Sequence, residues 1–425
     1  MSKIKAFKGL RPKPEIAAKL SVLPYDVVSS EEAAQLAKGN KYSFFHITKP
    51  EIDLDKNIDL YADIVYETAK KNFNEFIKKG YFIIENKDCL YLYKQIMNNR
   101  AQIGLFACAS VDEYEQDLIK KHELTRKDKE DDRARHVYET NCNAGPVFLT
   151  YRAKKEIDEI INNFLKTAQP ICDFVATDSG VEVRHIFYII SDDNLIKKLI
   201  DLFKEVPCLY VADGHHRAAS GYRVRAMRRA QNPNHTGNEE YNYFLTALFP
   251  HNQLNIMPYN RVVKNLNGLN ENSLLEKIKE KFDIKELQIK NYSPNKTKNI
   301  GMYLNKKWYN LMPKANTFNV NSPIDTLDVS ILQNNLLKPL LGIDDPRTSK
   351  RINFIGGIRG PQELEKLVDS GEYEIAFSMY PTSVEELMKI ADAGEIMPPK
   401  STWFEPKLRS GLVVHLLDDV SILKK

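Results

Sequence analysis

The apolar stretches of this chain are short, and polar turns or helical segments separate them. The strongest of them, residues 102–111 and 186–190, have the length of a β-strand and fall far below the roughly 18 apolar residues of a membrane-spanning helix. The sequence therefore predicts a sheet-containing globular protein that does not enter a membrane. At roughly 100–200 residues per domain, a chain of 425 residues predicts two or three packed units.

The first 111 residues predict an α+β region. Ser29 and Glu32 stand at capping-box spacing before a helix, and a second helix is expected at 58–79, ending before Gly80. Three apolar stretches separated by short polar breaks then follow up to residue 111, which is typical of a β-meander.

The rest of the chain alternates between strand and helix patterns. Within residues 112–263, strands at 241–249 and 255–263 are expected to return the chain to one sheet. The alternation continues through 264–425. The predicted fold class is α+β, with a central mixed α/β domain at 112–263 embedded between an N-terminal α+β region at 1–111 and a C-terminal α+β domain.

Charge and cysteine content narrow the class of protein further. Lys and Arg number 61 against 57 Asp and Glu, a formal net charge of +4, which argues against a dedicated polyanion binder but allows a local basic pocket. The N-terminus has lysines but no apolar segment of a secretory signal. The cysteines are odd in number and far apart, so we expect buried free thiols in a cytoplasmic protein. They are Cys89, Cys108, Cys142, Cys172 and Cys208.

The most informative segment runs from Cys208 to Ser220. An apolar strand leads into Asp213 and Gly214, a turn pair, and then into a basic helix that begins with two histidines and Arg217. The start of a helix binds anions because its first N–H groups lack intrahelical partners and its dipole is positive there. Arg217 and a protonated histidine would add charge for a phosphate. The alternative is a structural strand–turn–helix junction with Asp213 as the N-cap and histidines that bond buried carbonyls.

A second candidate segment, Leu118–Arg126, contains Glu123 among basic residues. Near a bound phosphate, this carboxylate could accept a proton from a substrate hydroxyl. The alternative is that the segment belongs to a solvated, charged helix.

Other motifs do not support a different chemistry. His215 and His216 are adjacent rather than four residues apart, and Arg126 stands where a zinc-binding His122-Glu123 motif needs its second histidine. Magnesium carried in with a nucleotide is compatible with the sequence, with Asp213 as an oxygen ligand. Segments 356–360 and 396–407 lack the glycine order of a dinucleotide fingerprint and of a phosphate-binding loop.

Lys121-His122-Glu123, paired with Asp213-Gly214-His215-His216-Arg217, resembles the free serine kinases of the ParB/sulfiredoxin-like superfamily. This resemblance covers about residues 112–260. The chain as a whole is similar to a large bacterial domain-of-unknown-function family. That similarity rests on Pro24–Val27, Tyr241–Phe244, Tyr259–Val263, Asp345–Arg347 and Pro398–Pro406.

The kinase resemblance implies a phosphotransferase that uses ATP or ADP and Mg²⁺ to convert free L-serine to O-phosphoserine. It implies that Glu123 deprotonates the hydroxyl, that Asp213 and His216 are catalytic with Asp213 also near the metal, and that Gly214, His215, His216 and Arg217 bind the phosphates. The implied partners are a nucleotide and a small hydroxy amino acid. The alternatives are a nucleotide-binding regulator without phosphotransfer and a ParB-like nucleotide-dependent DNA binder, and the small net charge makes nucleic acid the weaker of these.

Overall fold

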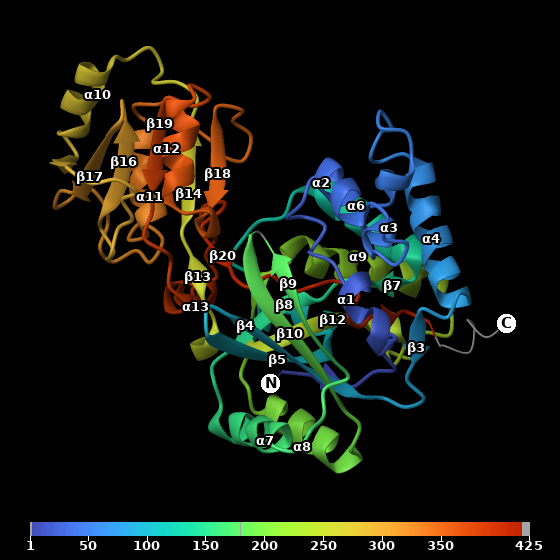
Figure 1. Ribbon diagram of the computed structural model, residues 1–425. Coiled ribbons are helices and arrows are strands. Elements are labelled where there is room, and N and C mark those ends of the chain that lie inside the picture. Colours follow the sequence, from blue (N-terminus) through green and yellow to red (C-terminus); the bar gives the residue numbers. More distant parts are fainter. Residues whose placement is uncertain (1, 179, 419–425) are drawn as a thin grey trace. The chain divides into compact units, whose positions relative to one another are not determined.

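The computed structural model describes residues 2–178 and 180–418, and it has the expected α+β fold class (Figure 1). The chain forms two compact units. The first combines Met1–Lys121, Thr125–Leu254 and Pro406–Lys425, and the second combines His122–Leu124 with Asn255–Glu405. Each unit has a sheet of its own, and each is described here by itself.

A mixed nine-stranded sheet is the centre of the first unit. Its strand order is β6-β11-β8-β12-β5-β4-β10-β9, with β1 paired to β5, and only the pairs β6/β11 and β8/β12 are parallel. Strands β4 and β5 of the predicted region 1–111 lie between β12 and β10 of the predicted region 112–263, so these regions share one sheet. The strands are β1 (Ile4–Lys5), β4 (Leu90–Met97), β5 (Arg100–Ser110), β6 (Ile119–Lys120), β8 (Val147–Tyr151), β9 (Cys172–Asp178), β10 (Val181–Ile190), β11 (Leu209–Asp213) and β12 (Tyr243–Pro250).

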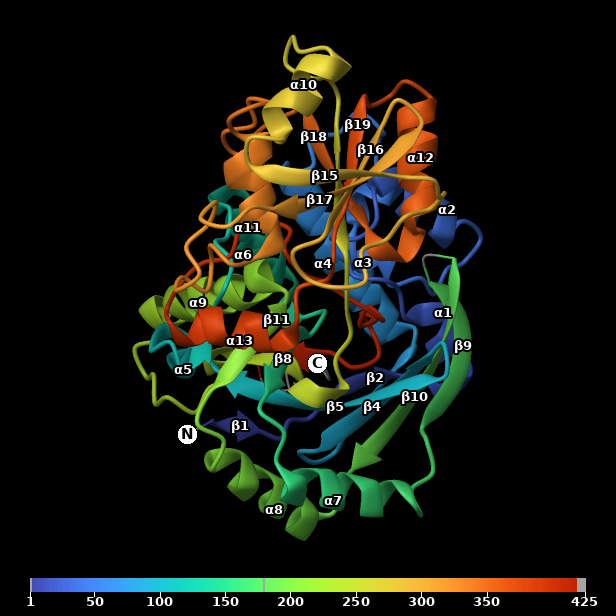
Figure 2. The ribbon, with the colours of Figure 1, turned by 90° about the vertical axis from the view of Figure 1, so that its left-hand side faces the viewer.

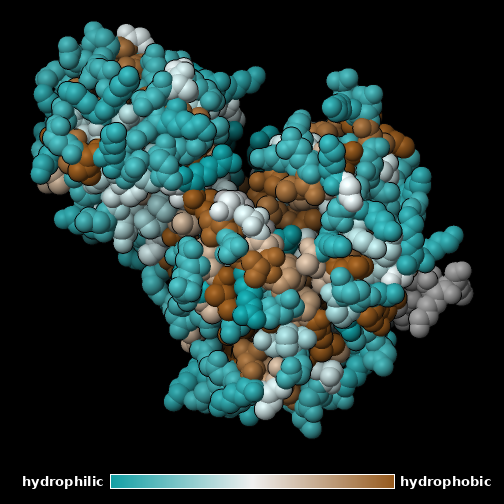
Figure 3. Space-filling view, in the orientation of Figure 1, coloured by the Kyte–Doolittle hydropathy of each residue, from teal (hydrophilic) through white to brown (hydrophobic). Residues whose placement is uncertain are grey.

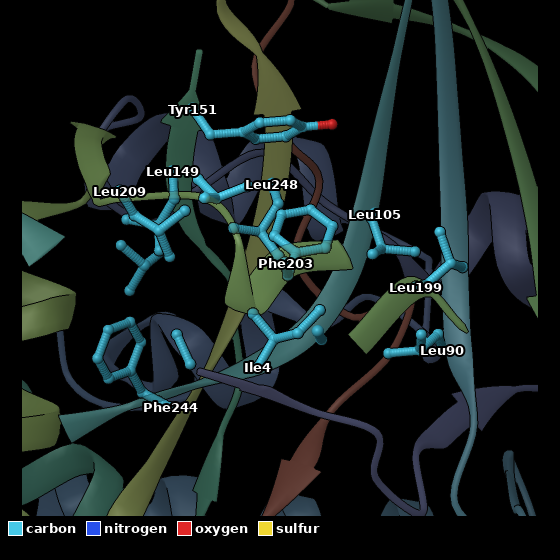
Figure 4. Packing of buried hydrophobic residues seen from close by; sticks show 14 of the residues in the cluster. Ile4, Leu90, Leu105, Leu149, Tyr151, Leu199, Phe203, Leu209, Phe244 and Leu248 are labelled. Atoms are coloured by element: carbon cyan, nitrogen blue, oxygen red, sulfur yellow. The ribbon is translucent and has the colours of Figure 1, made fainter. Parts of the chain in front are cut away.

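The two faces of this sheet follow the two-residue period of β-strands. Leu90 and Leu92 of β4 belong to a large aliphatic cluster, part of which is shown in Figure 4. Tyr91 and Tyr93 point to the opposite face, where both rings contact Phe187 of β10 with centroids 5.6 and 5.8 Å apart. Both faces are therefore buried, which explains why the central strands are apolar almost throughout.

Helices α7 (Lys155–Leu165) and α8 (Asp193–Lys204) lie side by side on the aliphatic face (Figure 1 and Figure 2). The buried residues of α8 are Ile196, Leu199 and Phe203, which follow the three- and four-residue spacing of an amphipathic helix. The side chain of Asp192 caps α8 by accepting a hydrogen bond from the Leu195 N–H.

The remaining helices of the first unit include two of the predicted ones. The capping box of Ser29 and Glu32 is confirmed, with both reciprocal hydrogen bonds formed. The helix expected at 58–79 begins only at Asp63, and Gly80 follows its end with a φ of 67°. These helices are α1 (Ala17–Leu20), α2 (Ser30–Ala37), α3 (Phe45–Thr48), α4 (Asp63–Lys78), α5 (Val111–Glu115), α6 (Lys127–Thr140) and α9 (His215–Gln231).

The predicted meander is only partly correct. β4 and β5 form its hairpin, but β3 (Phe82–Ile84) pairs with β2 (Leu10–Pro12) in a separate two-stranded sheet. Near the C-terminus, β21 (His415–Leu416) pairs with β7 (Cys142–Asn143). Both small sheets join segments far apart in sequence, and such pairing has no local sequence signal.

The second unit is built on a six-stranded antiparallel sheet in the order β15-β17-β16-β19-β14-β18. The prediction that residues 255–263 return to the central sheet is wrong, because β14 lies in this second sheet. Its strands are β14 (Tyr259–Val263), β15 (Phe282–Leu287), β16 (Ile300–Leu304), β17 (Lys307–Pro313), β18 (Ile352–Gly356) and β19 (Ile375–Ser378), and β13 (Ile256–Met257) pairs with β20 (Trp403–Phe404). Its helices are α10 (Glu271–Ile278), α11 (Asp328–Leu332), α12 (Pro361–Asp369) and α13 (Val384–Asp392).

The surface of the second unit is mostly hydrophilic in the view of Figure 3, whereas hydrophobic residues gather on the visible face of the first unit. Within the described part of the chain, no helix is both long and apolar enough to cross a membrane. The five cysteines are free thiols, as predicted. Cys89, Cys108 and Cys142 are buried, whereas Cys172 and Cys208 are only partly buried, so the expected burial holds for three of the five.

The aliphatic core of the first unit generates a stability prediction. Leu149 of β8 is fully buried, whereas Leu36 of α2 is 57% exposed. Leu149→Ala is expected to reduce the free energy of unfolding by about 2–5 kcal/mol, because it removes buried methyl groups and leaves a cavity. The control Leu36→Ala is expected to change it by less than about 0.5 kcal/mol. Urea titrations of the intact chain measure both, and equal effects would contradict the assigned core.

A charged cluster generates a pH prediction. Glu240 lies 2.6 Å from Lys5 Nζ and 3.0 Å from Nε2 of the buried His415. Burial opposes its ionisation, but His415 and Lys5 together lower the pKa of Glu240 from 4.5 to about 2. A carboxyl group whose pKa is lower in the folded state stabilises the protein at pH values above its unfolded pKa. This stabilisation is lost as the pH falls towards the folded pKa. The melting temperature is expected to fall between pH 4.5 and 2, and less steeply in Glu240→Gln. Identical pH profiles of the two proteins would refute this assignment.

Candidate functional site

The candidate site begins where β11 ends and α9 starts. The pairing of β11 with β8 shifts register between Val211 and Asp213, an irregularity that redirects side chains at the end of a strand. Gly214 follows with φ 91° and ψ 33°, left-handed values that glycine adopts without strain. A Cβ at this position would lie 2.9 Å from Arg217 Nε. The predicted strand–turn–helix segment is therefore present, and its tight turn needs glycine.

Gly214, and not Asp213, is the N-cap residue of α9. The Asp213 side chain instead accepts a hydrogen bond from the adjacent Gly214 N–H at 2.8 Å. The interpretation of Asp213 as a structural N-cap is thus wrong, because the chain makes one more turn residue before the helix. The Asp213 carboxylate is left to interact with charged side chains rather than to cap the helix.

Two cations hold Asp213 in its ionised form. Lys407 Nζ lies 3.3 Å from its Oδ2, and Arg217 Nη2 lies 3.9 Å from its Oδ1. Burial opposes ionisation, but these two charges lower the pKa of Asp213 well below its usual range. Lys407 is itself buried. Sequence reasoning missed its role, because nothing in the spacing relates residue 407 to residue 213.

Arg217 is the most enclosed cation at the start of α9, with only 11% of its side chain exposed. Its Nη1 donates to the Pro146 carbonyl, and Nη2 lies 3.8 Å from the Asp26 carboxylate. Its Nε is buried and has no hydrogen-bond partner among the described residues. Arg217 therefore retains an unused donor, and Asp26 of the Pro24–Val27 segment lies beside the site.

The two histidines differ from the expectation of a protonated imidazole. His215 is buried, and burial lowers its pKa to about 4 although the Asp213 carboxylate acts in the opposite direction, so it is neutral near pH 7. His216 Nε2 accepts a hydrogen bond of 3.1 Å from the Arg126 N–H, so this nitrogen carries no proton. The positive charge at the start of α9 therefore comes from Arg217.

Two further arginines of α9, Arg223 and Arg225, are used in ion pairs. Arg225 donates to Asp112 and, at 2.5 Å, to Glu115, while Arg223 pairs with Asp131. These pairs fix α9 to α5 and α6. The residues predicted to bind phosphate therefore lie in the first turn of α9 and not along the whole helix.

Glu123 lies in the short coil His122–Leu124, which groups with the second unit. In that unit the Met397 N–H donates to the His122 carbonyl at 2.8 Å. The structure thus brings Asp213, Gly214, His215, His216 and Arg217 together in the first unit, while the role of Glu123 stays a prediction. The charged helix expected around Glu123 begins only at Lys127.

Asp213 fits the predicted magnesium role in one respect. It is an ionised carboxylate, the type of ligand that Mg²⁺ prefers, and Mg²⁺ in nucleotide sites often takes one or two carboxylates with the remaining oxygens from phosphates and water. Because Lys407 and Arg217 already neutralise this carboxylate, a single Asp213 fits a magnesium ion only together with nucleotide phosphates.

Comparison with solved structures gives distant similarities. A conserved hypothetical protein from Pyrococcus furiosus is 13% identical over 74% of this chain and 95% of its own, with a TM-score of 0.35. A free serine kinase in complex with AMP is 12% identical over 73% and 89%, with a TM-score of 0.34. SbnI with a C-terminal truncation, from Staphylococcus aureus, is 12% identical over 75% and 89%, with a TM-score of 0.33. At these TM-scores the similarities establish no property of this chain.

Comparison with curated proteins gives no match. A family model does match, over residues 4–330, which is most of the chain and includes the junction of β11 and α9. The predicted membership of a domain-of-unknown-function family is thereby confirmed: the chain belongs to the family described as protein of unknown function (DUF1015).

Proposed function

We propose that the protein is a nucleotide-dependent phosphotransferase that transfers a phosphoryl group from ATP or ADP to the hydroxyl of free L-serine, giving O-phosphoserine. The observation that carries the proposal is the first turn of α9, where the left-handed Gly214 turns the chain into the helix and Arg217 holds an unused, buried Nε–H. The resemblance of the two short motifs to free serine kinases of the ParB/sulfiredoxin-like superfamily supports the choice of acceptor.

The start of α9 suits a phosphate group for three reasons. The N–H groups of the first turn lack intrahelical partners, the helix dipole is positive at this end, and Arg217 adds a full charge. Because His215 is neutral and buried, it contributes to the shape of the site rather than to its charge. The arrangement favours binding of the phosphates of a nucleotide over recognition of its base.

Phosphoryl transfer requires mainly positioning and charge stabilisation. In the proposed reaction, the serine oxygen forms a bond to the terminal phosphorus while the bond from that phosphorus to the bridging oxygen breaks. The nucleotide leaves with one phosphate fewer, and the Glu123 carboxylate accepts the hydroxyl proton. Asp213 would hold Mg²⁺ together with the phosphates, and the ion would supply neutralisation of the phosphate oxygens when bound. His216, fixed by Arg126, would border the phosphates.

The role of Glu123 generates the first functional prediction. Purified protein incubated with L-serine, Mg²⁺ and either ATP or ADP is expected to produce O-phosphoserine, detected by phosphorus NMR. Glu123→Gln is expected to reduce the rate by about 100-fold or more, because general-base assistance typically contributes about 10²–10⁴-fold. Nucleotide binding by the variant is expected to be unchanged.

Glu159→Gln, a change at an exposed residue of α7, is the matched control and is expected to retain full activity. Nucleotide hydrolysis that does not depend on serine, with no phosphoserine formed, would refute the proposal. Nucleotide binding without any turnover would instead favour the regulatory alternative, and retardation of DNA would favour the ParB-like one.

Arg217 generates a separate binding prediction. Arg217→Lys keeps the positive charge but removes the planar fork and the Nε–H. The affinity for ADP is expected to fall by about tenfold or more, since hydrogen bonds to charged groups contribute about 1.5–3 kcal/mol. Arg229→Lys, at an exposed position of the same helix, should leave the affinity unchanged. Isothermal titration calorimetry measures both, and an equal loss in the two variants would contradict a specific role of Arg217.

A further inference from the structure

A small pocket in the first unit lies next to the start of α9 and shares Arg217 with it. We call it the two-arginine pocket, because Arg133 and Arg217 both line it and the described lining contains no aspartate or glutamate. Its other polar lining residues include Thr48 of α3, His136 of α6 and Ser220 of α9.

Arg133 is held in a fixed orientation at this pocket. Its guanidinium lies over the Tyr25 ring, 4.1 Å from the ring centroid, and its Nε donates to Asp132 Oδ2 at 2.9 Å. Asp132 also accepts a hydrogen bond from Tyr66 at 2.8 Å. Only 13% of the Arg133 side chain is exposed. The stacking and the ion pair fix the guanidinium plane in advance, which reduces the entropy lost on binding a ligand.

His136 adds a neutral hydrogen-bond acceptor to the same lining. Its Nε2 lies 2.8 Å from the Ile47 carbonyl oxygen, which can only accept, so Nε2 carries the proton and Nδ1 has the lone pair. Burial and the nearby Arg133 charge lower the pKa of His136 to about 4. The pocket thus combines two cations with an imidazole that stays neutral near pH 7.

The size of the pocket limits the size of the anionic group that it can hold. Its volume is about 40 Å³, room for only a few water-sized groups, since each needs about 10–15 Å³. A carboxylate group fits in this space. The described lining contains no aspartate or glutamate, and guanidinium groups bind carboxylates through hydrogen bonds. Because Nε and Nη2 of Arg133 both pair with Asp132, the ligand would use the remaining donors of Arg133 and Arg217.

We propose that the two-arginine pocket binds the carboxylate of the acceptor, so that the acceptor is a small hydroxy acid such as a hydroxy amino acid. The assignment of this ligand as an acceptor rests on the proposed function. Arg217 borders both the pocket and the start of α9, so a hydroxyl attached to the bound acid would lie beside the phosphates. The acceptor class follows from the pocket and not from the nucleotide site.

The first test is direct binding to the full chain, without turnover. L-Serine and 3-hydroxypropanoate, which have the carboxylate, are expected to raise the melting temperature, because ligands that bind the folded state stabilise it. Ethanolamine, which has the hydroxyl and the amine but no carboxylate, is expected to have no effect. A rise with ethanolamine equal to that with L-serine, or no rise with either carboxylate, would overturn the proposal.

The second test uses Arg133, which lines the pocket from α6 rather than from α9. Arg133→Gln is expected to weaken L-serine binding at least tenfold and to leave ADP binding unchanged. Because this change deprives Asp132 of its partner and could affect folding, Arg133→Lys, which keeps the charge but not the fork, is measured in parallel with the same expectation. Arg135→Gln is the matched control, since Arg135 lies on the same helix, stacks over Tyr66 and pairs with the exposed Asp63. It is expected to bind both ligands normally.

The outcomes distinguish a failure of the pocket assignment from a failure of the proposed phosphotransferase function. If L-serine binds through Arg133 but no phosphoserine forms, the phosphotransferase proposal fails and the carboxylate pocket stands. If phosphoserine forms and the KM for serine is unchanged in Arg133→Lys, the pocket assignment fails and the reaction stands. A loss of ADP binding in the Arg133 variants that equals the loss of serine binding would overturn the assignment in favour of a nucleotide phosphate.

Discussion

The contact between Asp213 and Lys407 links the candidate site to the rest of the first unit. The two residues are 194 positions apart in sequence, yet their side chains meet at 3.3 Å. Lys407 is anchored through its own carbonyl, which accepts a hydrogen bond from Gln95 of β4. Two residues later, Arg409 donates to the carbonyl of Ser21. The segment that contains Lys407 is therefore part of the candidate site, because it supplies a cation that keeps Asp213 ionised.

Local sequence signals predicted the elements of the site well. The order of an apolar strand, Asp-Gly and a helix fixes a turn that only a glycine adopts without strain, and the structure has Gly214 there with φ 91°. The capping box at Ser29 was equally visible, since its two hydrogen bonds join residues three positions apart. Such features depend only on residues that are close together in the sequence. A single sequence is therefore enough to predict them.

Strand pairing and side-chain burial could not be predicted from local sequence signals in this way. β3 pairs with β2 rather than with its predicted hairpin partner, and β14 joins the second sheet, because the choice between apolar partners depends on the complete fold. The prediction of a protonated histidine was wrong for a related reason. A protonated histidine was expected at the start of α9, but His215 is buried, and burial lowers its pKa to about 4. Desolvation, which decides the protonation state, leaves no trace in residue spacing.

The small net charge of the chain is compatible with anion binding because the site pairs its cations internally. Arg133 contacts Asp132, Arg217 lies near Asp26 and Asp213, and Lys407 contacts Asp213. These carboxylates hold the guanidinium groups in place while the protein is free of ligand, so an arriving anion meets fixed donors rather than flexible ones. A low total charge also limits attraction of nucleic acids at long range. The proposed selectivity for small anions rests on the enclosed placement of a few arginines, which a count of charged residues does not reveal.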